Sequence, residues 1–169
     1  MATRGELHLV FLAALFLPCF PALGQRTGST EFFDKSNFYG DTLFIKARFM
    51  ECGEWGGHLE TTKVFLRGDN FHFSYRKYRT DCSKVNDSNA EPPQILEQSE
   101  ERRLSDKGKQ VIKQYACSLI AAKFKEPATM HAGYIFEMKN KEETINIHVY
   151  TWGRTTKNEY LIFIAELLH

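Results

Sequence analysis

Alternation of apolar and polar side chains is the feature that most constrains how this chain can fold. In the segment 42–50, every second residue from Leu43 to Phe49 is apolar, so these side chains share one side of an extended backbone. The same period of two recurs in 60–67 and 71–80, and turn residues separate the three segments. The pattern therefore predicts three β-strands joined by short connections.

A single helix follows these strands. Apolar residues recur three and four positions apart in the segment 105–124, which is the spacing of one face of an α-helix. The stripe consists of Val111, Ile112, Tyr115, Leu119, Ile120 and Ala122. Ser105 or Asp106 can cap the first turn, and Pro127 ends the helix.

Three further segments follow the helix. The segments 134–139 and 144–152 read as paired strands, and 159–168 is mostly apolar, as in a central strand covered on both faces. A terminal helix is the alternative for 159–168, because its leucines and alanine also fit the helical period. Counting 159–168 as a strand gives three strands on each side of the helix.

This order predicts an α+β fold: an antiparallel sheet of about six strands, arranged as three strands, one helix and three strands, with the helix packed on one face. Residues 25–41 would be a lead-in segment and 42–169 a single domain. We expect a flexible loop at 83–103, because paired prolines and many polar residues occur there. Ile95 and Leu96 would dock this loop or mark a short extra strand.

The amino terminus has the order of a secretory signal peptide. Arg4 precedes an apolar run at 9–17, and small residues precede a cut before Gln25. The run is shorter than the roughly 20 apolar residues that span a bilayer. We therefore expect residues 1–24 to be removed, the mature chain to have no membrane span, and the protein to be exported, either secreted or periplasmic. The proline before Cys19 argues against a lipid-modified cysteine.

An exported chain can also be modified outside the cell. Asn86 begins the triplet Asn-Asp-Ser, which fits the N-glycosylation sequon and lies in the expected loop. Asn86 is therefore a candidate glycosylation site.

Charge and motifs exclude several classes of function. The chain has 22 Lys and Arg against 21 Asp and Glu, so its net charge of +1 lacks the basic excess of a nucleic-acid binder. It contains no phosphate-binding glycine loop, no serine-hydrolase elbow and no zinc-protease motif. We expect no nucleic-acid partner, no metal, no cofactor and no catalytic residue, and we leave open whether the partner is a protein or a small ligand.

The densest group of functional residue types is the segment 51–60, which reads Glu-Cys-Gly-Glu-Trp-Gly-Gly-His-Leu-Glu. Glu54, Trp55 and His58 are its candidate ligand-binding residues. The structural alternative is a hairpin connection whose glycines form a bulge and whose cysteine is in a disulfide. The spacing of Cys52 and His58 matches no common zinc signature.

Cys52 and Cys82 are predicted to form a disulfide. In an up-down-up meander, each follows a strand of the same direction, so both lie at one edge of the sheet, and curling of the strand ends would bring them within bonding range. Cys117 would remain a thiol on the helix. The competing hypothesis is that Cys52 stays a thiolate and binds a metal with His58.

The stretch from Cys52 to His58 resembles a C-G-E-aromatic-G-G-H signature of small exported proteins of unknown function. No activity accompanies this resemblance, so it implies a small exported domain and assigns no site.

One helix cannot cover both faces of a six-stranded sheet, and an open face would gather basic and aromatic side chains. The basic residues are Lys46, Arg48, Lys63, Arg67 and Arg76. The aromatic and imidazole residues are Phe44, Phe65, Tyr78, His148, Tyr150 and Trp152. Such a set can hold an anionic ligand or a partner protein, although a solvated antiparallel face has a similar composition. We take Arg48, Arg76, Tyr150 and Trp152 as its candidate binding residues.

Two functions follow from these observations. The first is an exported, non-catalytic domain that binds a partner or ligand through its open sheet face or its glycine-rich loop. The second is a small hydrolase or metal-dependent enzyme that uses the 51–60 loop. Its residues would be Glu51, Cys52, Glu54, His58 and His72.

Overall fold

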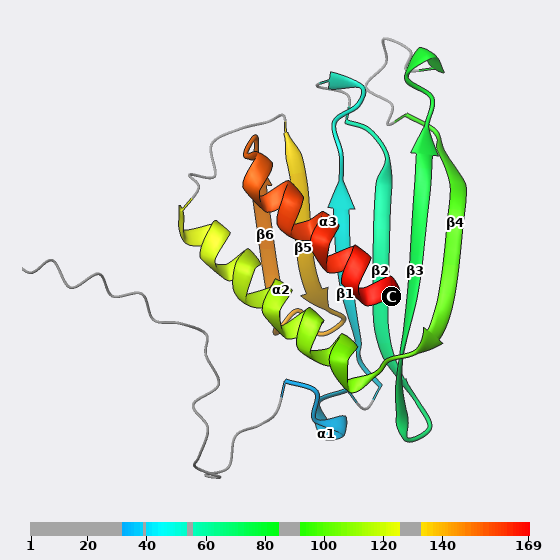
Figure 1. The fold of residues 1–169 in the computed structure, drawn as a ribbon, viewed down its shortest axis with the longest axis vertical. Helices are drawn as coiled ribbons and strands as arrows, with labels where there is room; N and C mark the ends of the chain where they lie inside the picture. The colour runs from blue at the N-terminus through cyan, green and yellow to red at the C-terminus, as the bar shows by residue number, and fades with distance from the viewer. Residues whose placement is uncertain (1–31, 39, 54–55, 85–91, 126–132) are drawn as a thin grey trace, which may run out of the picture.

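The computed structural model of the protein describes residues 32–38, 40–53, 56–84, 92–125 and 133–169. It has the α+β architecture and the six-stranded antiparallel sheet that the sequence predicts (Figure 1). The elements in chain order are α1 (Lys35–Phe38), β1 (Thr42–Arg48), β2 (Leu59–Arg67), β3 (Asn70–Thr80), the 3₁₀ turn η2 (Cys82–Lys84), β4 (Gln94–Arg103), α2 (Asp106–Lys125), β5 (Tyr134–Asn140), β6 (Asn146–Thr151) and α3 (Arg154–Leu168).

The sheet has the strand order β4-β3-β2-β1-β5-β6, and every neighbouring pair is antiparallel. The first four strands form a meander, in which each strand pairs with the next. The helix α2 then carries the chain across to β5, which pairs with the free side of β1. This crossover makes β1 a central strand, so residues from both halves of the chain meet around it.

The prediction of a flexible loop at 83–103 is wrong for its second half, because Gln94–Arg103 forms β4. This strand pairs with β3 from Thr80↔Gln94 to His72↔Arg103. Its sequence is polar because it is an edge strand, whose backbone pairs on one side and whose side chains are mostly exposed. The possibility of an extra strand at Ile95 and Leu96 is therefore correct.

The strand predicted at 159–168 is also wrong, and the helical alternative is correct. In α3, Tyr160, Phe163, Ile164 and Leu167 are buried, at the three- and four-residue spacing of one helical face. Leu161 and Ile162 are exposed although they are apolar. The continuous apolar run hid the helical period, because the exposed positions are as apolar as the buried ones.

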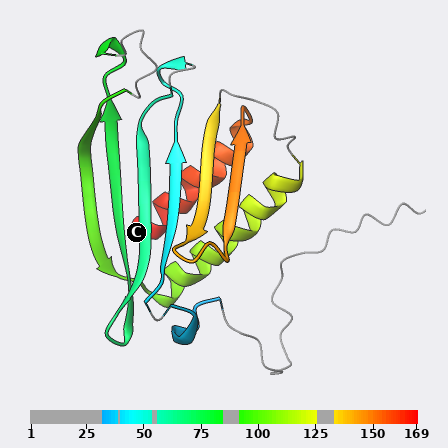
Figure 2. The same ribbon diagram turned by 180° about the vertical axis from the view of Figure 1, so that it is seen from behind.

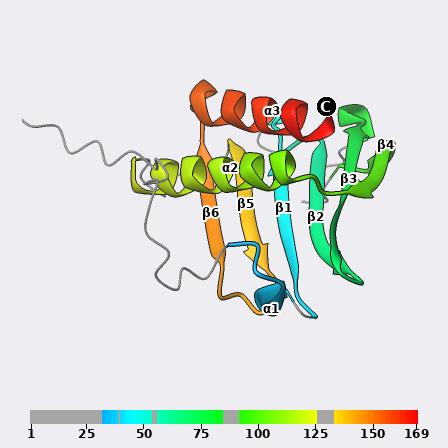
Figure 3. The same cartoon turned by 60° about the horizontal axis from the view of Figure 1, so that its bottom comes forward.

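The predicted helix at 105–124 is confirmed as α2, and Ser105 caps it by accepting a 3.0 Å hydrogen bond from the Gly108 amide. Both α2 and α3 lie across one face of the sheet (Figure 3). The core between these two helices and the sheet contains Leu43, Ile45, Phe73, Ile112, Leu119, Phe136 and Tyr160. The supposed lead-in segment contributes to this core, because Phe33 and Phe38 are buried against Phe71.

Seen from behind, the second face of the sheet carries no helix among the described residues (Figure 2). We call this second side the open face. None of the helices in the described ranges combines the length and apolar character needed to cross a bilayer. The residues of the expected signal peptide, Cys19, Glu54, Trp55 and Asn86 lie outside the described residues.

Candidate functional site

The connection between β1 and β2 is folded tightly back on itself. The amide of Phe49 donates to the carbonyl of His58 at 3.0 Å, and the amide of Cys52 donates to that of Gly56 at 2.7 Å. A β-carbon added at Gly57 would lie 2.0 Å from Oε2 of Glu51 and 2.5 Å from the carbonyl oxygen of Phe49. Glycine is therefore required at 57, because no side chain fits between these groups.

The predicted disulfide joins Cys52 to Cys82, with Cα atoms 5.3 Å apart. Cys52 lies in the β1–β2 connection, and Cys82 begins the turn after β3. These two segments lie at the same end of the sheet in Figure 1. The bridge therefore ties the loop to a strand two positions away, so Cys52 is not available as a nucleophilic or metal-binding thiolate. Cys117 is not part of this disulfide.

His58 lies between two carboxylates. Its Nδ1 contacts Oε1 of Glu51, and its Nε2 lies 3.1 Å from Oε1 of Glu60. Glu51 also accepts a 2.8 Å hydrogen bond from the backbone amide of His58. Since only the protonated imidazolium can donate from both ring nitrogens, this arrangement stabilises the charged histidine.

The pKa of His58 reflects this competition. Burial of the ring, the largest single influence, opposes the positive charge. The hydrogen bond to Glu60 and the charge and hydrogen bond of Glu51 together outweigh burial, so the pKa of His58 is raised above its usual value. The raised pKa widens the pH range over which the charged ring links the loop to β2.

Glu60 carries this network into the core. Its exposed fraction is 4%, and its Oε2 accepts hydrogen bonds from Tyr75 at 2.8 Å and Tyr160 at 3.1 Å. Burial, the largest influence, favours the neutral acid, but the hydrogen bonds from His58, Tyr75 and Tyr160 together lower the pKa of Glu60 below its usual value. Residues of β2, β3 and α3 are thus joined through one buried carboxylate.

One aromatic ring covers a face of the same histidine and is itself held by other aromatic residues. The His58 ring stacks on Phe49, and Phe49 contacts Tyr134 and Tyr160 edge-on. Lys157 of α3 places its ammonium 5.0 Å from the centre of the Tyr134 ring. This packing restricts the imidazole to the plane in which both nitrogens meet carboxylates.

Of the described residues in the hydrolase hypothesis, His72 lies apart from Glu51, Cys52 and His58. His72 lies on β3 opposite Phe65 and stacks on that ring, whereas His58 lies beyond the other end of β2. Both nitrogens of His58 already face carboxylates, so the ring has no free lone pair with which to act as a general base. Within the described ranges, no group of three or more histidine, cysteine or carboxylate side chains is arranged to hold a metal ion.

The open face brings together most of the basic and aromatic residues that the sequence places there. One hollow of about 440 Å³ is lined by Phe44, Lys46, Leu59, Thr61, Thr62, Lys63, Arg76, Tyr78 and Lys139. An adjoining hollow of about 210 Å³ is lined by Lys46, Arg48, Leu59, Ile135, Glu137, His148 and Tyr150. The two hollows share Lys46 and Leu59, so they form one depression that extends from β3 to β6.

Three of the expected residues lie apart from these hollows. Phe65 and Arg67 pack on each other near the far end of β2, where Arg67 pairs with Glu101 at 2.6 Å. Trp152 is exposed directly after β6 and lines neither hollow. His58 belongs to the buried network instead of the open face.

Sequence reasoning missed Lys139, Tyr75 and Tyr160 as site residues. Lys139 could have been found from the alternation of side chains in β5, because residues two apart lie on the same face and Lys139 therefore shares a face with Glu137 and Ile135. Tyr75 and Tyr160 offered no such signal, because their apolar neighbours make them look like ordinary core residues.

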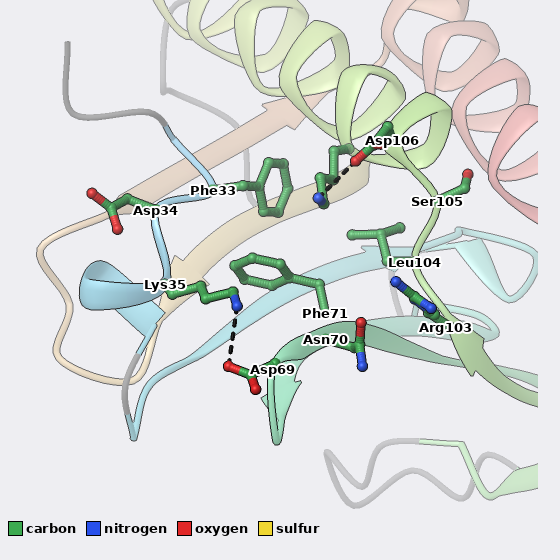
Figure 4. Close-up of a pocket in the computed structure, with 11 residues that line it drawn as sticks. Phe33, Asp34, Lys35, Asp69, Asn70, Phe71, Arg103, Leu104, Ser105 and Asp106 are labelled. Carbon is green, nitrogen blue, oxygen red and sulfur yellow. Dashed lines mark hydrogen bonds and ion pairs between the residues drawn. The ribbon is translucent and has the colours of Figure 1, made fainter.

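A further cavity of about 810 Å³ lies at the opposite end of the sheet, between α1, the β2–β3 turn and the start of α2 (Figure 4). Phe33 and Phe71 form part of its wall, and four of its charged groups form two ion pairs. Lys35 lies 3.1 Å from Asp69, and Lys109 lies 2.8 Å from Asp106. These internal ion pairs leave less charge for a ligand than the open face offers.

Comparison with protein-family models, with curated proteins and with solved structures finds no match to this chain. The function must therefore be argued from the chemistry of the site itself. Two features enter that argument: the Glu51–His58–Glu60 network, which is buried at Glu60 and exposed at Glu51, and the basic depression on the open face.

Proposed function

We propose that the protein is an exported, non-catalytic domain whose open face binds an anionic partner or ligand. The observation that carries the proposal is the charge of the larger hollow. Lys46, Lys63, Arg76 and Lys139 all line it, and no ion pair joins any of them to another side chain of the described residues.

Three basic residues of the neighbouring edge of the sheet do have acidic partners. Arg67 pairs with Glu101, Lys77 with Glu97, and Arg102 with Glu100. Glu137 lies on the open face, but it is engaged by His148 at 2.9 Å. Lys46 has Glu137 opposite it in the sheet register, so the four cations outnumber the carboxylates beside them. Their mutual repulsion is relieved by an anionic ligand.

The Glu51–His58–Glu60 network supports a binding role over a catalytic one. Glu51, His58 and Glu60 satisfy one another, and the disulfide fixes Cys52 beside them. Groups held in this way stabilise the end of the sheet and leave no nucleophile or base poised toward a substrate. We therefore assign the Glu51–His58–Glu60 network a structural function.

Export is supported by two independent features. The apolar run at 9–17 and the small residues before Gln25 have the order of a signal peptide. A disulfide between Cys52 and Cys82 persists in an oxidising compartment, outside the cell or in the periplasm. The intact mass of the secreted protein should correspond to a chain that begins at Gln25. A product that keeps 9–17, or begins at a lipid-modified Cys19, would contradict this proposal.

Binding is tested by titrating isotope-labelled protein with an acidic oligosaccharide, an acidic peptide and anionic lipid vesicles, while the backbone amides are followed by NMR. At least one probe should shift the amides around Lys46, Lys63 and Lys139. The double variant Lys46→Glu, Lys63→Glu should lose this response. The matched control Lys107→Glu, Lys113→Glu reverses the same charge on α2, on the other side of the sheet, and should keep it. If no probe binds, or if the shifts surround His58 instead, the proposal is wrong.

A further inference from the structure

The cations of the open face follow a regular geometric pattern. In the register of the sheet, Arg76 of β3 and Lys46 of β1 occupy one cross-strand row, through Thr61 of β2. Lys63 of β2 and Lys139 of β5 occupy the next row, through Phe44 of β1. Within these two rows, β3, β2, β1 and β5 carry one cation each, alternately in the first and in the second row. Arg48 of β1 lies one row further along the same face, and Glu137 of β5 lies opposite Lys46 in the first row.

This alternation defines a zigzag lane across four strands. Neighbouring strands are about 4.8 Å apart, and the two rows are separated by about 6.8 Å, the rise of two residues along a strand. A ligand that runs across the strands between the rows meets a positive charge on alternate sides at each step. The hollow of about 440 Å³ contains all four cations, so it forms this part of the lane.

We propose that the ligand is an acidic oligosaccharide with one carboxylate on each sugar, laid across the strands in this lane. The inference deepens the proposed function and rests on it. In a 1,4-linked polyuronate with a two-fold screw, successive carboxylates point to opposite sides of the chain. One sugar advances this chain by a length comparable with the strand spacing of about 4.8 Å. Charge direction and repeat length therefore both match the zigzag.

The other groups of the depression suit a sugar. Thr61 and Tyr78 offer hydroxyl groups, and Leu59 offers apolar surface for the carbon–hydrogen face of a sugar ring. Glu137 can accept hydrogen bonds from sugar hydroxyls at the β5–β6 end of the lane. A ligand that carries both carboxylates and hydroxyls uses all of these groups.

Two other extended polyanions fit less well. An acidic peptide advances about 3.3 Å per residue, so its charges fall out of step with strands about 4.8 Å apart, and extended peptides usually pair with a sheet edge. Single-stranded nucleic acid binds by stacking its bases on exposed aromatic faces. On this surface the face of Phe44 is occupied by the Lys63 ammonium, 5.7 Å from the ring centre.

The test is isothermal titration calorimetry of the exported chain with 1,4-linked mannuronic acid oligomers of increasing length. Affinity should rise with each sugar up to the tetramer, because the lane has four cations, and then level off. Uncharged cello-oligomers of the same linkage should not bind. Each added contact between a carboxylate and a cation should strengthen binding about tenfold, and added salt should weaken it.

Variants locate the binding. Lys46→Glu, Lys63→Glu should weaken tetramer binding by at least about a hundredfold, whereas Lys107→Glu, Lys113→Glu on α2 should leave it unchanged. Circular dichroism melting of both variants confirms that they are folded.

Other results would overturn the inference in different ways. If a tetraglutamate peptide or a single-stranded oligonucleotide binds the open face more tightly than the tetramer does, the ligand class is wrong and the proposed function stands. If affinity does not depend on oligomer length, the lane is wrong. If none of these anions binds the open face, both the inference and the proposed function fail.

Discussion

The ring of His58 lies flat against the ring of Phe49, with centroids 4.2 Å apart and an angle of 6° between the planes. The two residues also share a backbone hydrogen bond at the base of the β1–β2 connection. The imidazole is thus held from above by an aromatic ring and at both edges by carboxylates. A charged ring in this position makes stability depend on pH.

The first prediction is that the free energy of unfolding is greatest in a pH range set by the titration of His58 and Glu60. The pKa of His58 is raised from 6.5 by folding, so its contribution is complete below pH 6.5 and is lost as the pH rises through the folded value. The pKa of Glu60 is lowered from 4.5, so its contribution is present above pH 4.5 and is lost as the pH falls through the folded value. The free energy of unfolding, measured in denaturant across pH, should be greatest between these limits.

The variant His58→Gln is the reference for this measurement. It removes the titrating group but keeps a side chain of similar size that can hydrogen-bond. Its free energy of unfolding should lack the decline on the alkaline side. An alkaline decline of the same size in both proteins would assign it to another residue.

The second prediction concerns the buried carboxylate. Glu60→Ala removes the acceptor shared by Tyr75, Tyr160 and His58, and this leaves two buried hydroxyls without an acceptor and the Nε2 of His58 without its carboxylate. We expect a loss of about 3–5 kcal/mol in the free energy of unfolding, as for other broken buried ion pairs. Tyr75→Phe removes only one donor and should cost about 1 kcal/mol. Equal costs for the two variants would show that Glu60 does not organise the network.

The third prediction follows from the crowding at Gly57. Alanine there would place its β-carbon against the backbone of Phe49 and the carboxylate of Glu51, so the loop must open. We expect a cost of about 1–3 kcal/mol from this overpacking. The control Gly40→Ala has a left-handed φ of 77° but no atom within 4 Å of the new β-carbon. Backbone strain alone should therefore cost less, about 1 kcal/mol, and thermal unfolding of both variants compares the two effects.

The sheet and α2 could be predicted because their apolar patterns have a clear period. Val111, Ile112, Tyr115 and Leu119 are all buried in α2, as their spacing predicts. The strand β4 could not be predicted in the same way, because an edge strand is held by backbone hydrogen bonds and its polar side chains show little alternation. In α3, apolar residues on the exposed side removed the contrast on which the helical period depends.

The site was predictable in part for a similar reason. Because side chains alternate between the two faces of a strand, the sequence correctly placed Arg48, Arg76 and Tyr150 on one face of the sheet. The link between His58, Tyr75 and Tyr160 depends on where α3 crosses the sheet, and no local sequence pattern encodes that position. The disulfide between Cys52 and Cys82 could be predicted because both cysteines follow strands that run in the same direction.

The fourth prediction joins the disulfide to the histidine network. Cys52 is adjacent to Glu51, so the bridge to Cys82 holds the carboxylate that contacts His58. The bridge spans a sequence separation of 30 residues, and closing a loop of this size should stabilise the fold by about 3–4 kcal/mol. In the variant Cys52→Ser, Cys82→Ser, the freed loop should let Glu51 move away from the ring. We therefore expect the pKa of His58 to fall toward its usual value, as measured by NMR titration of the imidazole protons.

Cys117→Ser leaves the bridge intact and should retain the raised pKa. If the pKa of His58 stays raised without the bridge, Glu51 is positioned by the backbone of the loop alone, and the loss of stability would then report only chain entropy.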